Sequence, residues 1–116
     1  MLHKMGLSEE PFQSIKSGKK IVEVRLNDDK RRKIEVGDTI EFLKVPEEKG
    51  TLTAKVLQLR TYDTFLSMYK DIPFSDFDCE GWTMEEMIKG TYEIYTPEQE
   101  EKWGTLAITL EKITLD

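Results

Sequence analysis

The amino-acid sequence predicts an α+β fold, a small mixed β-barrel flanked by short helices. Short segments with strand-like patterns follow one another at 20–26, 38–45, 51–60 and 106–111, and the helical patterns do not alternate with them as they would in a parallel fold. Within 51–60 the apolar positions change parity, which indicates a bulge or sharp bend of the kind found at barrel corners. The 116 residues suffice for a single domain over 1–116 with its own core.

The first half of the chain is expected to hold one short helix and three strands. Ser8 suits the N-cap of the helix, two acidic residues and a proline follow it, and Gly18 suits the position just after the helix. Three β-branched residues predict the strand at 20–26. The next two strands each place apolar residues on one face, and 46–50 is expected to join them as a hairpin loop.

The second half is expected to hold three helices and a closing strand. Residues 65–72 carry apolar side chains at i, i+3, i+4 and i+7, which predicts a helix that Pro73 ends. Sequences of the capping-box form predict the starts of the next two helices, Thr83 with Glu86 and Thr96 with Gln99. Gly104 is expected to close the last helix, and the alternation over 106–111 predicts a strand with one buried face.

The net charge of −6 averages two unlike parts of the chain. Residues 13–33 contain eight basic and three acidic residues, a net charge of +5, which leaves −11 for the rest. Non-specific binding of nucleic acid needs many phosphate contacts spread over one face, so this distribution argues against it. The basic segment is either a local site for an anionic ligand or a solvated hairpin.

Several classes of site are excluded by composition. The single cysteine, Cys79, and the single histidine, His3, allow neither an intramolecular disulfide nor a Cys/His zinc site, and Cys79 is expected to be a buried, inert thiol. Neither a phosphate-binding P-loop motif nor a dinucleotide-binding glycine motif occurs. Because no long apolar run follows the N-terminus, we expect a cytoplasmic protein without a secretory signal or membrane span, and we expect no metal and no cofactor.

The groups best suited to binding or catalysis lie between residues 18 and 25. The two-residue period of a strand puts Glu23 and Arg25 on one face, about 6–7 Å apart, and Lys20 lies at the entrance of the strand. A cation, a carboxylate and a guanidinium would then border one mouth. The alternative is an ion pair between Glu23 and Arg25 that orients the barrel wall, with Lys20 merely solvated.

The pattern G-x-K-x-x-E-x-R, filled by Gly18, Lys20, Glu23 and Arg25, resembles the signature of ASCH domains. The preceding helix at 11–17 and the turn at 36–38 are also similar to that family, and the resemblance covers essentially the whole chain. ASCH domains are similar in fold to PUA domains, small β-barrels flanked by helices, and many PUA-like domains bind RNA. The resemblance therefore implies a cleft beside the strand at 18–25 that receives RNA, a nucleotide or a modified nucleoside.

The resemblance also implies an alternative function. Some small bacterial ASCH proteins are amidohydrolases that remove the acetyl group from acetylcytidine with a lysine, a threonine and a glutamate. The lysine corresponds to Lys20 and the glutamate to Glu80, but Glu23 stands where the threonine would be. Glu23 would have to act as an acid, a base or a carboxylate nucleophile in place of the hydroxyl, so binding ranks above catalysis by a set of Lys20, Glu23 and Glu80.

Residues outside the signature complete the expected ligand site. Arg31 and Arg32 can meet phosphates at its rim, or simply belong to a solvated turn. Trp82 can stack on a base, although a place at the edge of the core is the alternative. The full set of expected ligand-binding residues is Gly18, Lys19, Lys20, Glu23, Arg25, Arg31, Arg32 and Trp82. A protein-interaction domain that uses its acidic face is a third hypothesis, and the oligomeric state does not follow from the sequence.

Overall fold

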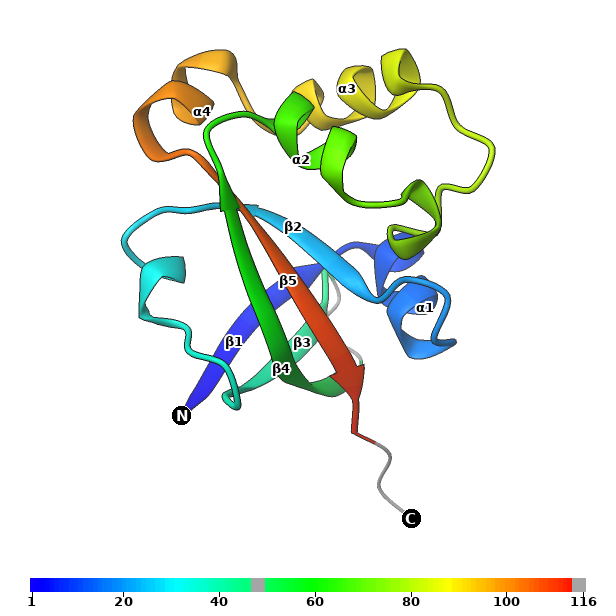
Figure 1. Cartoon of the computed structure of the whole chain (residues 1–116). Coiled ribbons are helices and arrows are strands. Elements are labelled where there is room, and N and C mark those ends of the chain that lie inside the picture. The colour runs from blue at the N-terminus through cyan, green and yellow to red at the C-terminus, as the bar shows by residue number, and fades with distance from the viewer. Residues whose placement is uncertain (47–49, 114–116) are drawn as a thin grey trace.

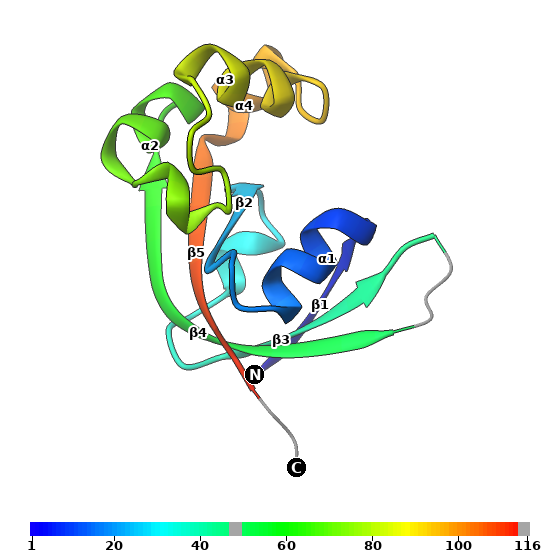
Figure 2. The ribbon, with the colours of Figure 1, turned by 90° about the vertical axis from the view of Figure 1, so that its right-hand side faces the viewer.

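Five strands form one mixed sheet in the order β1-β3-β4-β5-β2 in the computed structural model, which describes residues 1–46 and 50–113 (Figure 1). The strands are β1 (Leu2–Leu7), β2 (Val22–Leu26), β3 (Thr39–Lys44), β4 (Thr51–Tyr62) and β5 (Thr105–Lys112). β1 runs parallel to β3, and every other neighbouring pair is antiparallel. The predicted α+β fold, a small mixed β-barrel flanked by short helices, is confirmed, with the sheet curved into a half-barrel (Figure 2).

The strand β1 is the main addition to the expected elements, because the sequence patterns assigned no residues to it. Only Met5 and Leu7 of this strand are buried, and Gly6 and polar residues separate and precede them. Two buried positions are too few to show the alternation of a strand. β3 pairs with β1 over its full length, with Leu2 opposite Thr39 and Leu7 opposite Lys44. A pairing between segments so far apart in the chain cannot be predicted from the pattern of residues 2–7 alone.

The change of parity in the third expected strand corresponds to a β-bulge in β4. The register with β5 shifts between Val56 and Gln58, so Leu57 is the extra residue. Leu57 is exposed, whereas Leu59 packs against the core. Figure 2 shows that β4 bends along its length and that the sheet curves with it. Of the hairpin loop expected at 46–50, residues 47–49 lie outside the described residues.

The four α-helices occur where the sequence predicts them: α1 (Glu9–Lys16), α2 (Phe65–Asp71), α3 (Met84–Tyr92) and α4 (Pro97–Trp103). Both capping boxes are formed. The hydroxyl oxygens of Thr83 and Thr96 accept from the backbone N–H groups of Glu86 and Gln99, and the side chains of Glu86 and Gln99 accept from the backbone N–H groups of the two threonines. Helices α2, α3 and α4 gather at one end of the sheet, whereas α1 lies on its concave side (Figures 1 and 2). None of the described helices is long and apolar enough to cross a membrane.

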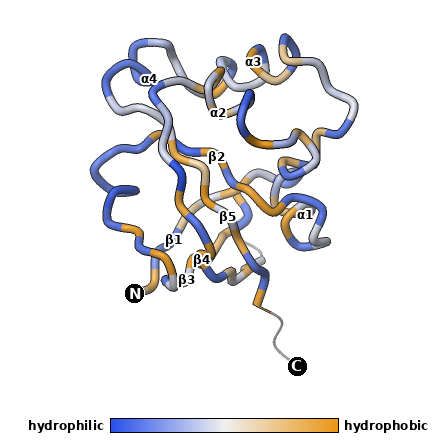
Figure 3. The backbone as a smooth tube through the Cα atoms, in the orientation of Figure 1, coloured by the Kyte–Doolittle hydropathy of each residue, from blue (hydrophilic) through white to orange (hydrophobic). Residues whose placement is uncertain are grey.

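Two clusters of buried side chains hold these layers together. Phe12 and Ile15 of α1 join residues of β1, β3, β4 and β5 in the first cluster, which fills the half-barrel. Phe65 and Tyr69 of α2 join Val22 of β2 and side chains of α3 in the second, which fixes the helices over the end of the sheet. Figure 3 shows apolar and polar residues alternating along the strands, as this one-sided burial requires.

Alanine substitutions at Gly104 and Gly18 compare a positive-φ glycine that has a close backbone neighbour with one that has none. Gly104 has φ 72° and ψ −173°, and a Cβ atom there would lie 3.1 Å from the Tyr62 carbonyl oxygen. Gly104→Ala is therefore expected to lower the free energy of unfolding by about 2 kcal/mol. Gly18→Ala is the control, because Gly18 also has positive φ (82°) but nothing lies within 4 Å of its Cβ position. We expect about 1 kcal/mol for it in the same urea titration, and equal losses would contradict the steric argument.

Candidate functional site

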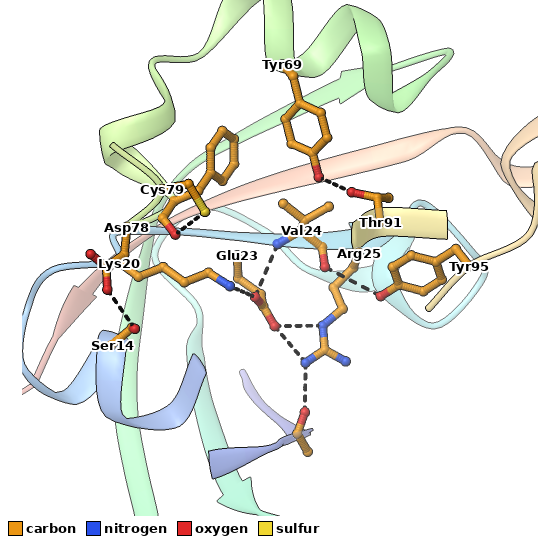
Figure 4. Close-up of polar contacts among 12 residues, drawn as sticks. Ser14, Lys20, Glu23, Val24, Arg25, Tyr69, Asp78, Cys79, Thr91 and Tyr95 are labelled. Atoms are coloured by element: carbon orange, nitrogen blue, oxygen red, sulfur yellow. Dashed lines mark hydrogen bonds and ion pairs between the residues drawn. The ribbon is translucent and has the colours of Figure 1, made fainter. Parts of the chain in front are cut away.

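The strand β2 lies at an edge of the sheet and carries the signature residues into a shared space. After Gly18 the chain turns, and Lys20 forms an isolated β-bridge with Phe77 before the strand begins. β2 pairs with β5 on one side only, with Glu23 opposite Ile108 and Arg25 opposite Leu106. Figure 4 shows Lys20, Glu23 and Arg25 side by side along this strand.

Glu23 is a buried carboxylate held between two cations. Its Oε1 lies 2.9 Å from Lys20 Nζ, and its Oε2 accepts from Arg25 Nη2 at 2.7 Å and from Arg25 Nε at 3.0 Å. Glu23 is only 4% exposed. Burial opposes its charged form, but Lys20 and Arg25 outweigh burial and hold the pKa of the carboxyl below its usual value. Glu23 is thus an ionised anchor that fixes the positions of both cations.

Arg25 also closes the half-barrel at this edge. Its Nη2 donates to the Gly6 carbonyl oxygen at 2.8 Å, so the guanidinium connects β2 with β1, the other edge strand. Lys20, with its side chain 15% exposed, and Arg25, 14% exposed, are both largely enclosed. Of the expected alternative, the Glu23–Arg25 pair is formed, but the solvated Lys20 is wrong, because Lys20 belongs to the same buried ion cluster.

A cavity of about 380 Å³ opens beside this cluster, between the two edge strands and under α3. The lining residues are Gly6, Leu7, Ser8 and Pro11 around the end of β1, Lys20, Glu23, Val24 and Arg25 at β2, Tyr69 of α2, Phe77, Cys79 and Trp82 of the following loop, and Met87, Gly90, Thr91, Ile94 and Tyr95 in and after α3. Such a site, mostly apolar with a few convergent charged groups, has the composition of a small-molecule pocket.

The structure brings four of the expected site residues to this cavity: Lys20, Glu23, Arg25 and Trp82. Trp82 is 47% exposed, as a stacking surface at a rim must be. A Cβ atom on Gly90 would lie 4.0 Å from Trp82 Cζ3, so the indole ring sits close to the helix at a position without a side chain.

Two other members of the expected set, Gly18 and Lys19, lie outside the cavity. Gly18 shapes the turn before β2, and Lys19 is exposed.

Arg31 and Arg32 do not form a rim to this cavity, which corrects the expectation. Arg31 pairs with Asp28 at 3.3 Å in a 3-10 turn (Arg31–Lys33). Arg32 donates from Nε to the Asn27 carbonyl oxygen at 2.7 Å and lies over the Trp103 ring, in a separate groove beside α4. The short turn after β2 carries the Arg32 side chain into the groove beside α4, and neither arginine lines the cavity.

Glu80 is likewise not where the hydrolase resemblance would require it. It is exposed in the turn before α3 and does not line the cavity, although its neighbour Cys79 does. The carboxylate that Lys20 contacts is that of Glu23, at 2.9 Å. Burial raises the pKa of the Cys79 thiol, so the thiol is disfavoured as a nucleophile at neutral pH.

The site also contains residues that sequence reasoning missed, namely Tyr69 and Thr91. Tyr69 belongs to the apolar stripe of α2, and nothing in that pattern distinguishes a core tyrosine from one that faces a cavity. Within the described part of the chain, no group of three or more His, Cys, Asp or Glu side chains is placed to hold a metal ion.

The curved mixed sheet, the helices gathered at one end and a cavity beside an edge strand define a PUA-like α+β domain. The family model of the ASCH domain matches residues 5–114, and the chain belongs to the ASCH domain family.

Solved structures agree with this assignment. Hypothetical protein PH0355 is 39% identical to this chain, with a TM-score of 0.87 over 97% of this chain and 100% of that one. Protein PF0455 from Pyrococcus furiosus is 35% identical, with a TM-score of 0.77 over 99% and 100%. A variant of the ASCH protein from Zymomonas mobilis is 19% identical, with a TM-score of 0.62 over 99% and 75%, and shares the fold. No curated protein matches the chain.

Proposed function

We propose that this ASCH domain binds RNA, a nucleotide or a modified nucleoside in the cavity beside β2. The observation that carries the proposal is the convergence of Lys20 and Arg25 on the cavity, with Glu23 ionised and buried between them. Two cations and one carboxylate leave a net positive charge at the mouth. That charge suits a phosphate or a polarised carbonyl oxygen of the ligand.

The size of the cavity supports a ligand of nucleoside size. Its volume of about 380 Å³ lies in the lower part of the range of small-molecule pockets. The apolar side chains of Val24, Phe77 and Met87 offer contacts to a flat heterocycle, and Trp82 at the rim offers a stacking surface. A longer RNA would then present one nucleotide to the cavity while the acidic remainder of the chain limits further phosphate contacts.

The buried ion cluster also prepares the cations for binding before the ligand arrives. An ammonium group has three hydrogens, and Glu23 takes one from Lys20, so the others are available to a ligand. Because Glu23 already holds both side chains, little of their conformational freedom is lost on binding. This favours recognition of a defined small group over diffuse attraction.

Removing either cation is expected to weaken binding in a salt-dependent way. Lys20→Ala and Arg25→Ala should each lower the affinity for a short RNA or a nucleotide, and each should reduce the slope of log affinity against log salt by about one unit. Arg32→Ala is the matched control, because Arg32 lies in the separate groove by α4. Calorimetric titration at three salt concentrations measures these values. Absence of binding by the unaltered protein at low salt would contradict the proposal.

The hydrolase hypothesis is a second candidate, since a lysine and a carboxylate face one cavity at 2.9 Å. The lowered pKa of Glu23 suits holding a positive charge rather than taking a proton, and Glu80 lies outside the cavity. Its test is turnover of acetylcytidine that disappears in Lys20→Ala. No turnover by the unaltered protein would reject this candidate without affecting the binding proposal.

A further inference from the structure

Two hydroxyl groups on the inner wall of the cavity form a pair with a defined direction. Thr91 Oγ1 donates to the Met87 carbonyl oxygen at 2.8 Å and lies 2.6 Å from the Tyr69 hydroxyl. A threonine hydroxyl has a single hydrogen, and here the Met87 carbonyl takes it. In the arrangement that makes both bonds, Tyr69 is the donor to Thr91, and both hydroxyls have their hydrogens committed. Figure 4 shows the contact between the two hydroxyls.

The remaining hydrogen-bonding capacity of this pair can only accept. Tyr69 Oη and Thr91 Oγ1 keep lone pairs but have no hydrogen to offer a ligand. Both residues are nearly buried, with Tyr69 6% and Thr91 7% exposed, and both line the cavity. Burial raises the pKa of Tyr69 to about 12, so its hydroxyl stays protonated and the direction of the pair holds at neutral pH.

Two other groups on the wall direct their hydrogens to the main chain in the same way. The Cys79 thiol donates to the Phe77 carbonyl oxygen and the Tyr95 hydroxyl donates to the Val24 carbonyl oxygen, each at 3.5 Å. At the mouth, the cations Lys20 and Arg25 keep donor hydrogens that Glu23 does not take. The cavity is thus polarised, with donors at its mouth and acceptors on its inner wall.

We propose that Tyr69 and Thr91 determine ligand specificity by selecting a nucleobase that presents an exocyclic amino group to this acceptor wall. The inference rests on the proposed function and names the class of base within it. A base that carries hydrogen in place of the amino group leaves the buried acceptors without a partner. The cost of an unsatisfied buried group corresponds to a roughly 5- to 150-fold loss of affinity.

The test compares ligands that differ only at this group. Calorimetric titration gives the dissociation constants of AMP and of purine riboside monophosphate, which lacks the 6-amino group. CMP and its analogue without the 4-amino group form a second pair. We expect the protein to bind at least one amino-bearing member at least about fivefold more tightly than its partner.

Variants at Thr91 separate specificity from a purely structural role. Thr91→Ser keeps the hydroxyl and is expected to keep the preference. Thr91→Val removes the acceptor of the Tyr69 hydroxyl, whose hydrogen then becomes available to the ligand, so the preference should fall and binding of the oxo-bearing IMP or UMP should rise relative to AMP or CMP. The affinity ratio is compared within each variant, and a general loss of folded protein leaves that ratio unchanged.

The outcomes distinguish the two proposals. Nucleotide binding with equal affinity for both members of each pair overturns the role of Tyr69 and Thr91 and leaves the binding function in place. A Thr91→Val variant with weaker binding but an unaltered ratio overturns it as well. Failure of every nucleotide and RNA to bind overturns the proposed function itself.

Discussion

Replacing Glu23 with glutamine is expected to lower the free energy of unfolding by about 3 kcal/mol at neutral pH. The carboxylate makes contacts of 2.9 Å with Lys20 and 2.7 Å with Arg25, and both cations are largely enclosed. A neutral amide leaves two positive charges close together without a compensating charge. Because these cations keep some exposure, the loss belongs at the lower end of the range for a broken buried ion pair.

The pH dependence of this loss has a definite sign. The pKa of Glu23 is lower in the folded protein than its usual value, so the unfolded chain binds the proton more readily. The stabilisation by the carboxylate is therefore fully present above about pH 5, and it is lost as the pH falls through the folded pKa. The difference between the unaltered protein and Glu23→Gln, measured by urea unfolding, should shrink below about pH 4. A difference that stays constant from pH 7 to pH 3 would contradict this account.

Glu9→Gln is the matched control for a surface carboxylate. Glu9 also contacts a lysine, Lys44, at 2.9 Å, but its side chain is 65% exposed. Exposed pairs of this kind contribute less than about 1 kcal/mol. The same substitution chemistry should thus give a small loss at Glu9 and a large one at Glu23, which attributes the difference to burial.

The elements that sequence reasoning predicted well are those with local signals. The capping boxes at Thr83 and Thr96 involve residues three positions apart, and both are formed as expected. The bulge at Leu57 follows from the parity of one strand. β1 was not predicted because its stability comes from pairing with β3, and residues 2–7 carry no local pattern that indicates this partner.

In the candidate site, too, contacts between residues close in the sequence could be predicted, whereas contacts between distant segments could not. Glu23 and Arg25 share a face because of the strand period, so their proximity could be predicted. The placement of Arg32 depends on the carbonyl groups of Asn27 and Trp103, the latter 71 positions away, and no spacing rule reports it. The Tyr69–Thr91 pair joins α2 to α3 across 22 positions, and its direction depends on a further bond inside α3.

Replacing Phe65 with alanine is expected to have the largest effect in the helical layer, a loss of about 3–5 kcal/mol in the free energy of unfolding. Phe65 is fully buried and stacks on Tyr95 with ring centres 5.6 Å apart and an angle of 16°. Its ring also meets Tyr92 edge-on at 6.3 Å. Leu66→Ala is the control. The side chain of Leu66, the next residue in α2, is 41% exposed, so its removal should lower the free energy of unfolding by less than about 1 kcal/mol.

The same residue connects the core to the cavity. Tyr95 lines the cavity, and its hydroxyl donates to the Val24 carbonyl oxygen on β2, so the stack on Phe65 positions a wall of the binding site. Phe65→Leu keeps a branched apolar side chain in the core and should cost less than Phe65→Ala, yet it removes the stacking partner of Tyr95. We therefore expect Phe65→Leu to remain folded but to bind the nucleotide more weakly than the unaltered protein in calorimetric titration. Unaltered affinity in a folded Phe65→Leu variant would show that the position of Tyr95 does not depend on this stack.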